Sequence, residues 1–189
     1  MPMLRSLFAA VFLAALVLPA LAADDILDAI EAARKAYQAG DMPNAKQSLD
    51  LASQLVGQKN AENFAALLPA ALPGWKAEKV ETTAVGVTVF GVTSASRRYT
   101  GPGDRDVQVR ITGDSALVLY FAQLFMNPTI AGAMGKLIRI GDQSAPQTNE
   151  GSINMVVANK FLVTVEGSAD VDAKLAYAQA IDIAKLSKM

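Results

Sequence analysis

The strongest internal hydrophobic segment runs from Asp114 to Pro128, with the sequence DSALVLYFAQLFMNP. This pattern predicts a helix, and apolar side chains would point from it in nearly every direction. A surface helix normally keeps one polar face, so a helix without one must be covered on all sides or must bind a partner. We therefore expect the rest of the chain to cover this central helix, with the N-terminal helices docking over or near residues 117–126.

Upstream of this helix, the apolar positions near the N-terminus recur three and four residues apart. They predict a first helix over residues 24–39, and Gly40 is expected to end it. Asp41 is a suitable cap for a second helix that runs to Gly57. A short third helix is predicted at about residues 61–71. The segment is therefore expected to be a helical hairpin followed by one short helix.

The small residues of this hairpin resemble those of a tetratricopeptide repeat. The matching positions are Ala33, Ala36, Gly40, Ala45, Leu49 and Ala52. The resemblance covers residues 26–59 only, and it implies contact with another protein and nothing more specific. Gly57 stands where the family often has proline, and no second copy follows, although such arrays need about three repeats. An ordinary αα-hairpin packed on the main domain is the simpler alternative.

From Trp75 onward the hydrophobic period changes to that of β-strands. Three strands are predicted between residues 76 and 112, and the central helix follows them. Three more are predicted between residues 136 and 166, followed by a last helix that runs from Ser168 or Asp170 to the C-terminus. The order βββα-βββα predicts an antiparallel sheet with helices packed on it, so the fold class is α+β.

The first 23 residues have the pattern of a secretory signal peptide. Arg5 gives the positive start, an apolar run follows, Pro19 breaks it, and residues 20–22 form a small-x-small cleavage site. An uncleaved membrane anchor is the alternative. We expect cleavage, export to the periplasm and a mature form that does not span the membrane. The chain is then divided into a signal peptide (1–23), an N-terminal helical region (24–72) and an α+β sandwich domain (73–189).

Composition removes several kinds of chemistry. The sequence contains no cysteine, which excludes disulfides and thiolate sites, and no histidine, which excludes histidine triads and ordinary zinc enzymes. The formal net charge of −1 does not suggest a nucleic-acid-binding protein. No motif for a nucleophile or a nucleotide loop is present. We therefore expect no catalytic residues, no metal and no cofactor.

Arginine is distributed unevenly along the chain. Five of the seven arginines lie between residues 97 and 139: Arg97, Arg98, Arg105, Arg110 and Arg139. The planar guanidinium suits carboxylate or phosphate, so an anion-binding or partner-binding surface is one interpretation. Strand alternation places Arg98 and Arg110 on one face of the sheet, with Arg97 and Tyr99 on the other. The alternative is a set of surface salt bridges with the carboxylates of Glu78, Glu81, Asp106 and Glu166.

Four apolar side chains complete the candidate surface for a ligand or partner. Trp75, the only tryptophan, would stack on a ligand or, more simply, close the junction between helices and sheet. Leu117, Phe121 and Phe125 of the central helix would line a groove if their cover is incomplete. In the last helix, Asp182 lies on an apolar side, where it would need a partner. Lys185 would supply one at the surface, and Arg110 or Arg139 would supply one inside the protein.

Three functions fit these observations. The first is a non-enzymatic interaction or binding protein whose partner is another periplasmic or envelope protein. The second is a carrier of an apolar or lipid ligand in a cavity beside residues 114–127. The third is a carboxylate-based hydrolase, since acid–base catalysis does not require histidine. The missing catalytic residues favour the first function.

Overall fold

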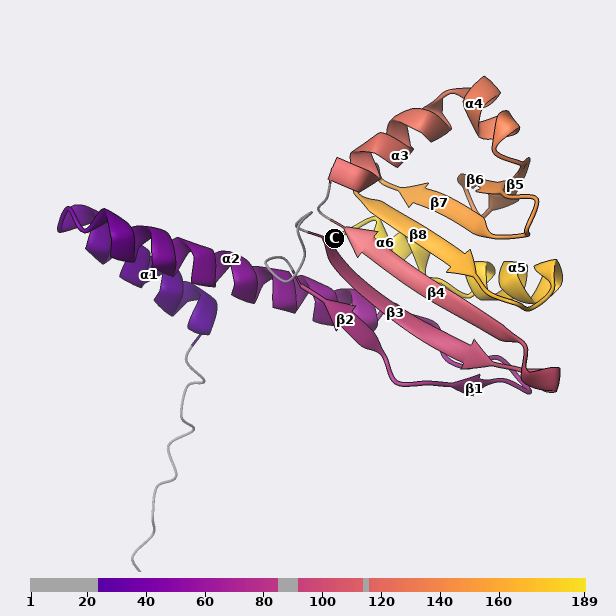
Figure 1. Ribbon diagram of the computed structural model, residues 1–189, viewed down its shortest axis with the longest axis horizontal. Helices are drawn as coiled ribbons and strands as arrows, with labels where there is room; N and C mark the ends of the chain where they lie inside the picture. The colour runs from indigo at the N-terminus through magenta and orange to yellow at the C-terminus, as the bar shows by residue number, and fades with distance from the viewer. Residues whose placement is uncertain (1–23, 85–91, 114–115) are drawn as a thin grey trace, which may run out of the picture.

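The structure is a computed structural model that describes residues 24–84, 92–113 and 116–189. The predicted signal peptide therefore lies outside the described residues. Figure 1 shows a helical hairpin that projects from one end of an α+β domain. The hairpin consists of α1 (Asp25–Gln38) and α2 (Met42–Ala65). In the described part of the chain, no helix is long and apolar enough to cross a membrane.

Carboxylates cap both helices of the hairpin, and the cap at Asp41 is the one that the sequence predicts. Asp24 accepts hydrogen bonds from the backbone N–H groups of the first turn of α1, and Asp41 accepts one from the backbone N–H of Asn44. The prediction that Gly57 ends the second helix is wrong, because α2 continues to Ala65 and includes the first five residues of the predicted third helix. An interior glycine costs about 1 kcal/mol relative to alanine. The burial of Phe64 near the end of α2 offsets that cost.

The hairpin leads into an antiparallel sheet, which confirms the α+β fold class. Its eight described strands are β1 (Lys76–Ala77), β2 (Glu81–Thr83), β3 (Thr93–Thr100), β4 (Asp106–Gly113), β5 (Lys136–Ile140), β6 (Gln143–Gln147), β7 (Ile153–Val157) and β8 (Phe161–Glu166). Their order is β1-β3-β4-β8-β7-β6-β5, and β2 also pairs with β3. Each predicted group of three strands contains four described strands, and the two groups meet where β4 pairs with β8.

One face of the sheet carries the main core. Alternate residues of the central strands point into it, including Val107, Val109 and Ile111 of β4. The C-terminal end of α2 packs there, with the ring centroid of Phe64 5.6 Å from that of Phe161. Tyr177 of α5 (Val171–Gln179) packs on Tyr99 of β3, with a centroid distance of 4.3 Å.

The last helix is not continuous, contrary to the prediction. It breaks after α5 and resumes as the short α6 (Ile183–Leu186). The break moves Asp182 off the apolar side of the helix. Its side chain is now exposed and caps α6 by accepting a hydrogen bond from the backbone N–H of Lys185 at 2.8 Å. An internal ion pair between Asp182 and Arg110 or Arg139 is therefore wrong, because the carboxylate turns to a helix N-terminus instead.

The central helix forms α3 (Ala116–Met126), and α4 (Pro128–Ala133) follows it. Val118 and Ala122 of α3 are buried, and the helix packs on β7 and β8. The prediction that this helix is covered on all sides is wrong, because Leu119 and Tyr120 are each 59% exposed. The predicted docking of the hairpin is also wrong. Its second helix packs mainly against β3 and β2, and Figure 1 shows the rest of the hairpin extending away from α3.

Candidate interaction surface

The strand register separates the arginines as the sequence predicts. Arg98 lies opposite Gln108, and Ser96 lies opposite Arg110, in the pairing of β3 with β4. Arg98 and Arg110 therefore share one face of the sheet, while Arg97 and Tyr99 belong to the core face. Arg97 thus points to the opposite side of the sheet from Arg98 and Arg110.

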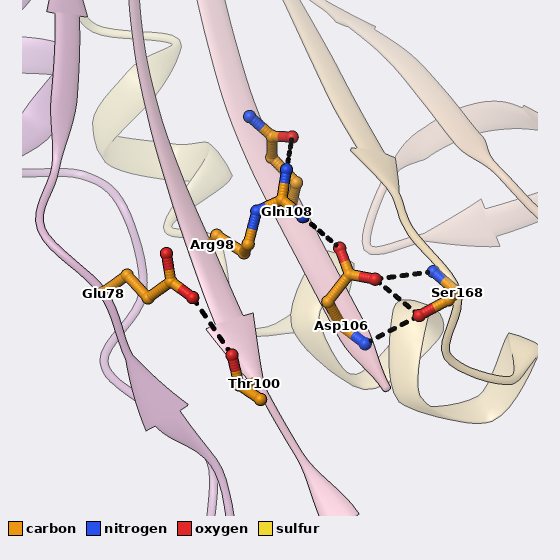
Figure 2. A network of polar contacts seen from close by, with 6 residues as sticks. All are labelled: Glu78, Arg98, Thr100, Asp106, Gln108 and Ser168. Atoms are coloured by element: carbon orange, nitrogen blue, oxygen red, sulfur yellow. Dashed lines mark hydrogen bonds and ion pairs between the residues drawn. The ribbon is translucent and has the colours of Figure 1, made fainter. Parts of the chain in front are cut away.

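Arg98 belongs to a polar network at one end of the sheet (Figure 2). Its guanidinium donates to the carboxylate of Asp106 at 3.1 Å and to Gln108 at 3.5 Å. Asp106 also accepts hydrogen bonds from the backbone N–H and the hydroxyl of Ser168, and its own N–H donates to that hydroxyl. The salt-bridge interpretation therefore holds for Arg98, whose partner is one of the four expected carboxylates.

The same contacts determine the charge state of Asp106. The hydrogen bond from the Ser168 hydroxyl lowers the pKa of the Asp106 carboxyl below its usual value of 3.8, and the positive charge of Arg98 lowers it further. A lowered pKa in the folded state means that ionised Asp106 stabilises the fold above that value. This contribution is lost as the pH falls below 3.8. The network thus fastens β3 and β4 to the segment that precedes α5.

Asp106→Asn is expected to lower the free energy of unfolding at neutral pH by about 1.5–3 kcal/mol, since a hydrogen bond to a charged group contributes about this much. The difference from wild type should shrink as the pH falls below 3.8 toward the lowered pKa of the Asp106 carboxyl. Urea unfolding at neutral and acidic pH measures both effects. Glu81→Gln, which changes an exposed carboxylate on β2, is the matched control. An equal loss of stability in the two variants would contradict the role of the network.

The remaining arginines do not form one site. Arg110 is half-buried and makes no ion pair or hydrogen bond with a described residue; its cross-strand neighbours are Ser96 and Thr164. Arg139 is exposed on β5. Because β5 lies four strands from β4, the two positions are roughly 19 Å apart across the sheet. A common anion site for Arg97, Arg110 and Arg139 is therefore incompatible with this topology.

The apolar members of the predicted surface are also dispersed. Trp75 is half-buried, with its ring edge-to-face against Tyr177 at 5.4 Å, and this packing fits the junction interpretation. Phe121 and Phe125 are half-buried on α3, with their ring centroids 5.6 Å apart. The side chain of Leu117 lies outside the described residues. Trp75 therefore belongs to the core face, whereas the two phenylalanines belong to a helix that packs on β7 and β8.

The largest group of exposed apolar side chains lies instead on the hairpin. Six residues that share one side of it are each between 42% and 65% exposed: Leu27, Ile30, Tyr37, Met42, Leu49 and Val56. We call these six residues the hairpin face. Three come from α1, at spacings that place them on one stripe of a helix, and three come from α2, each seven residues apart. The sequence pattern predicts apolar faces on both helices of the hairpin, but it does not predict that these faces are exposed.

The orientation of the two apolar stripes can be judged from a groove on the other side of the hairpin. A groove of 440 Å³ there is lined by Asp25, Asp28, Ala29, Ala32, Leu51 and Leu55. On α1, the stripe of positions 27, 30 and 37 lies on the side of the helix opposite positions 25 and 32. On α2, the stripe of positions 42, 49 and 56 lies opposite Leu51. Both stripes therefore lie on the side away from this groove. Both sides of the hairpin therefore carry apolar residues, and the groove side also carries Asp25 and Asp28.

Ion pairs lie within the hairpin face on α1 and beside it on α2. On α1, Arg34 binds Glu31 at 2.7 Å, and on α2, Lys46 binds Asp50 at 2.6 Å. Hydrogen bonding from Arg34 lowers the pKa of Glu31, so this carboxyl stays ionised at neutral pH. Protein–protein interfaces also combine exposed apolar side chains with arginine.

Comparison with known proteins adds no assignment. The chain matches no family model, no curated protein and no solved structure. Within the described residues, no group of three or more acidic side chains is placed to hold a metal ion. The candidate site therefore rests on the geometry of the hairpin face alone.

Proposed function

We propose that this chain is an exported, non-enzymatic interaction protein of the periplasm whose hairpin face binds a protein partner. The observation that carries the proposal is the exposure of all six residues of the hairpin face. Monomeric proteins rarely expose contiguous apolar patches larger than a few hundred Å² without a functional reason. Fully burying one large apolar side chain stabilises by about 1.5–3 kcal/mol, so covering six half-exposed ones supplies a substantial driving force.

The shape of the hairpin supports the same proposal. The C-terminal end of α2 is anchored in the core through Phe64, while the hairpin face lies on the projecting part (Figure 1). A partner therefore reaches this face without any rearrangement of the sheet. The signal-peptide pattern of residues 1–23 supports export, and the lack of cysteine and histidine supports a function without catalysis. The partner expected from this location is a periplasmic or envelope protein. The lipid-carrier and hydrolase alternatives stay predictions.

Site-specific photocrosslinking tests the proposal. A photoreactive amino acid at Leu49, in the middle of the hairpin face, is expected to give a discrete crosslinked product in intact cells. The same amino acid at Leu137, a comparably exposed apolar position on β5, is expected to give none. The mass of the product separates a second copy of the chain from a different protein. Absence of any product at Leu49 and at Ile30 would contradict the proposed function.

A further inference from the structure

We infer that the α+β domain docks on an anionic phospholipid surface through α3, α4 and β5. This inference concerns a second surface of the molecule and does not depend on what binds the hairpin face. Three observations support it: the absence of acidic residues from this part of the fold, the apolar side chains that it exposes, and the two basic residues beside them.

Acidic residues are missing from one continuous part of the domain. The elements α3, α4, β5, β6 and β7 contain no aspartate and no glutamate, and Lys136 and Arg139 of β5 are their only basic residues. The acids nearest to β6 are Asp142 and Glu150, which lie in the turns on either side of it. In the whole chain, 18 acidic residues outnumber 17 basic ones. The five elements thus carry a positive charge on a chain whose net charge is negative.

The same elements expose large apolar side chains. A surface helix normally turns a charged or polar face to the solvent. On α3, Val118 and Ala122 are buried against the sheet, whereas the opposite side of the helix exposes a leucine and a tyrosine. α4 contacts both α3 and β5, and each of these neighbours adds to the exposed apolar set. We call the following six residues the α3 surface: Leu119, Tyr120, Ile130, Lys136, Leu137 and Arg139.

The α3 surface lies on the side of the sheet away from the main core. Ile140 of β5 belongs to that core, so Leu137 and Arg139, which alternate with it, point to the opposite face. α3 covers this opposite face of β8, where Leu162 is buried outside the main core while neighbouring Val163 belongs to it. Figure 1 shows α3 and α4 along the border of the domain that is farthest from β1. The apolar and basic side chains are therefore presented together.

The charges of the α3 surface identify its occupant as a lipid surface with anionic headgroups. Helices that lie in the membrane interface combine apolar side chains with basic ones, and tyrosine is enriched at the level of the headgroups. Lys136 and Arg139 make no ion pair with a described residue, so both are available to headgroup phosphates. The hairpin face differs, because ion pairs with both signs of charge lie within and beside it.

The fold makes this docking peripheral and leaves the hairpin accessible. In the described part of the chain, no helix is long and apolar enough to cross a membrane, so the domain would lie on the lipid surface. The hairpin extends away from α3 (Figure 1), and a protein partner therefore reaches the hairpin face while the domain is docked. A lipid at Leu137 also agrees with the absence of a protein crosslink expected at that position.

Vesicle cosedimentation tests the inference. The protein purified after export is expected to sediment with vesicles of phosphatidylcholine and phosphatidylglycerol, and far less with vesicles of phosphatidylcholine alone. Leu119→Asp places a negative charge on the α3 surface and is expected to weaken binding at least tenfold. Leu27→Asp, at a leucine of similar exposure on the hairpin, is the matched control and is expected to bind like wild type. Failure to sediment with anionic vesicles, or equal weakening in both variants, would overturn the inference.

Charge substitutions test the contribution of the headgroups. Lys136→Gln and Arg139→Gln are each expected to weaken binding to the anionic vesicles about fivefold, the usual effect of one basic side chain near such a surface. Lys79→Gln changes an exposed lysine between β1 and β2, at the other border of the sheet, and is expected to change binding less than twofold. The same loss in all three variants would show that net charge governs binding and would overturn the α3 surface as the site.

A fluorescent label reports which part of the molecule meets the lipid. Because the chain contains no cysteine, one introduced cysteine can carry an environment-sensitive dye at a chosen position. With the dye at Tyr120→Cys, emission is expected to shift to shorter wavelength when anionic vesicles are added. With the dye at Tyr37→Cys, an exposed position on the hairpin, emission is expected to stay unchanged. A shift at Tyr37 alone, or at neither position, would overturn the inference, and the crosslink at Leu49 tests the proposed function separately.

Discussion

Phe64→Ala is expected to lower the free energy of unfolding by about 3–5 kcal/mol, the usual cost of removing a buried aromatic ring. Phe64 is 1% exposed and packs edge-to-face on Phe161 of β8. It lies near the C-terminal end of α2, where the hairpin meets the sheet. The ring packs closely against Gly113, where an added Cβ would lie only 2.6 Å from it. Loss of the ring therefore leaves a cavity where the projecting helix pair meets the core.

Urea unfolding followed by circular dichroism measures this loss. Leu51→Ala, at an exposed position on the same helix, is the matched control and is expected to change the unfolding free energy by less than about 1 kcal/mol. Limited proteolysis provides a second measurement, because a weakened anchor should expose the end of α2 before the sheet is cleaved. A cost below about 1 kcal/mol for Phe64→Ala would show that the hairpin is held mainly by other contacts.

The strand pattern could be read from the sequence because it is local. Val107, Val109 and Ile111 alternate with polar residues, and each of the three lies in the core face of β4. Alternation also separated Arg97 from Arg98, which the register confirms. Period-two patterns carry this information because one face of a sheet is buried and the other is more polar. The α+β class follows from the order of such segments.

The ends of the helices, and the parts of the chain that pack against them, were predicted less well, because they depend on distant residues. Gly57 ends no helix, since burial of Phe64 seven residues later favours continuing α2. Asp182 interrupts the last helix by capping a new one. The hydrophobic pattern also shows that a helix has an apolar face without showing what covers it. For that reason the sequence predicts neither the exposure of the hairpin face nor the packing of the hairpin away from α3.

Tyr177→Ala is the second substitution with a large expected effect, again about 3–5 kcal/mol. Tyr177 is fully buried on α5, between the rings of Tyr99 and Trp75. Its hydroxyl accepts a hydrogen bond from the backbone N–H of Leu72 at 3.2 Å, and Tyr99 donates one to the carbonyl of Pro69 at 2.6 Å. Burial raises the pKa of Tyr99 to about 12, so this hydroxyl stays a donor across the neutral range. The two tyrosines thus hold the segment that joins the hairpin to the sheet.

Tyr177→Phe separates the hydroxyl from the ring. It keeps the packing but leaves the N–H of Leu72 without its acceptor, so a loss of about 1–3 kcal/mol is expected. Trp75, the only tryptophan, reports the change directly. Its emission should shift to longer wavelength in Tyr177→Ala, which uncovers the indole, and stay near wild type in Tyr177→Phe. Tyr120→Ala, at an exposed tyrosine of α3, is the control for both measurements. If Tyr177→Ala and Tyr177→Phe cost the same, the hydrogen bond rather than the ring stabilises this junction.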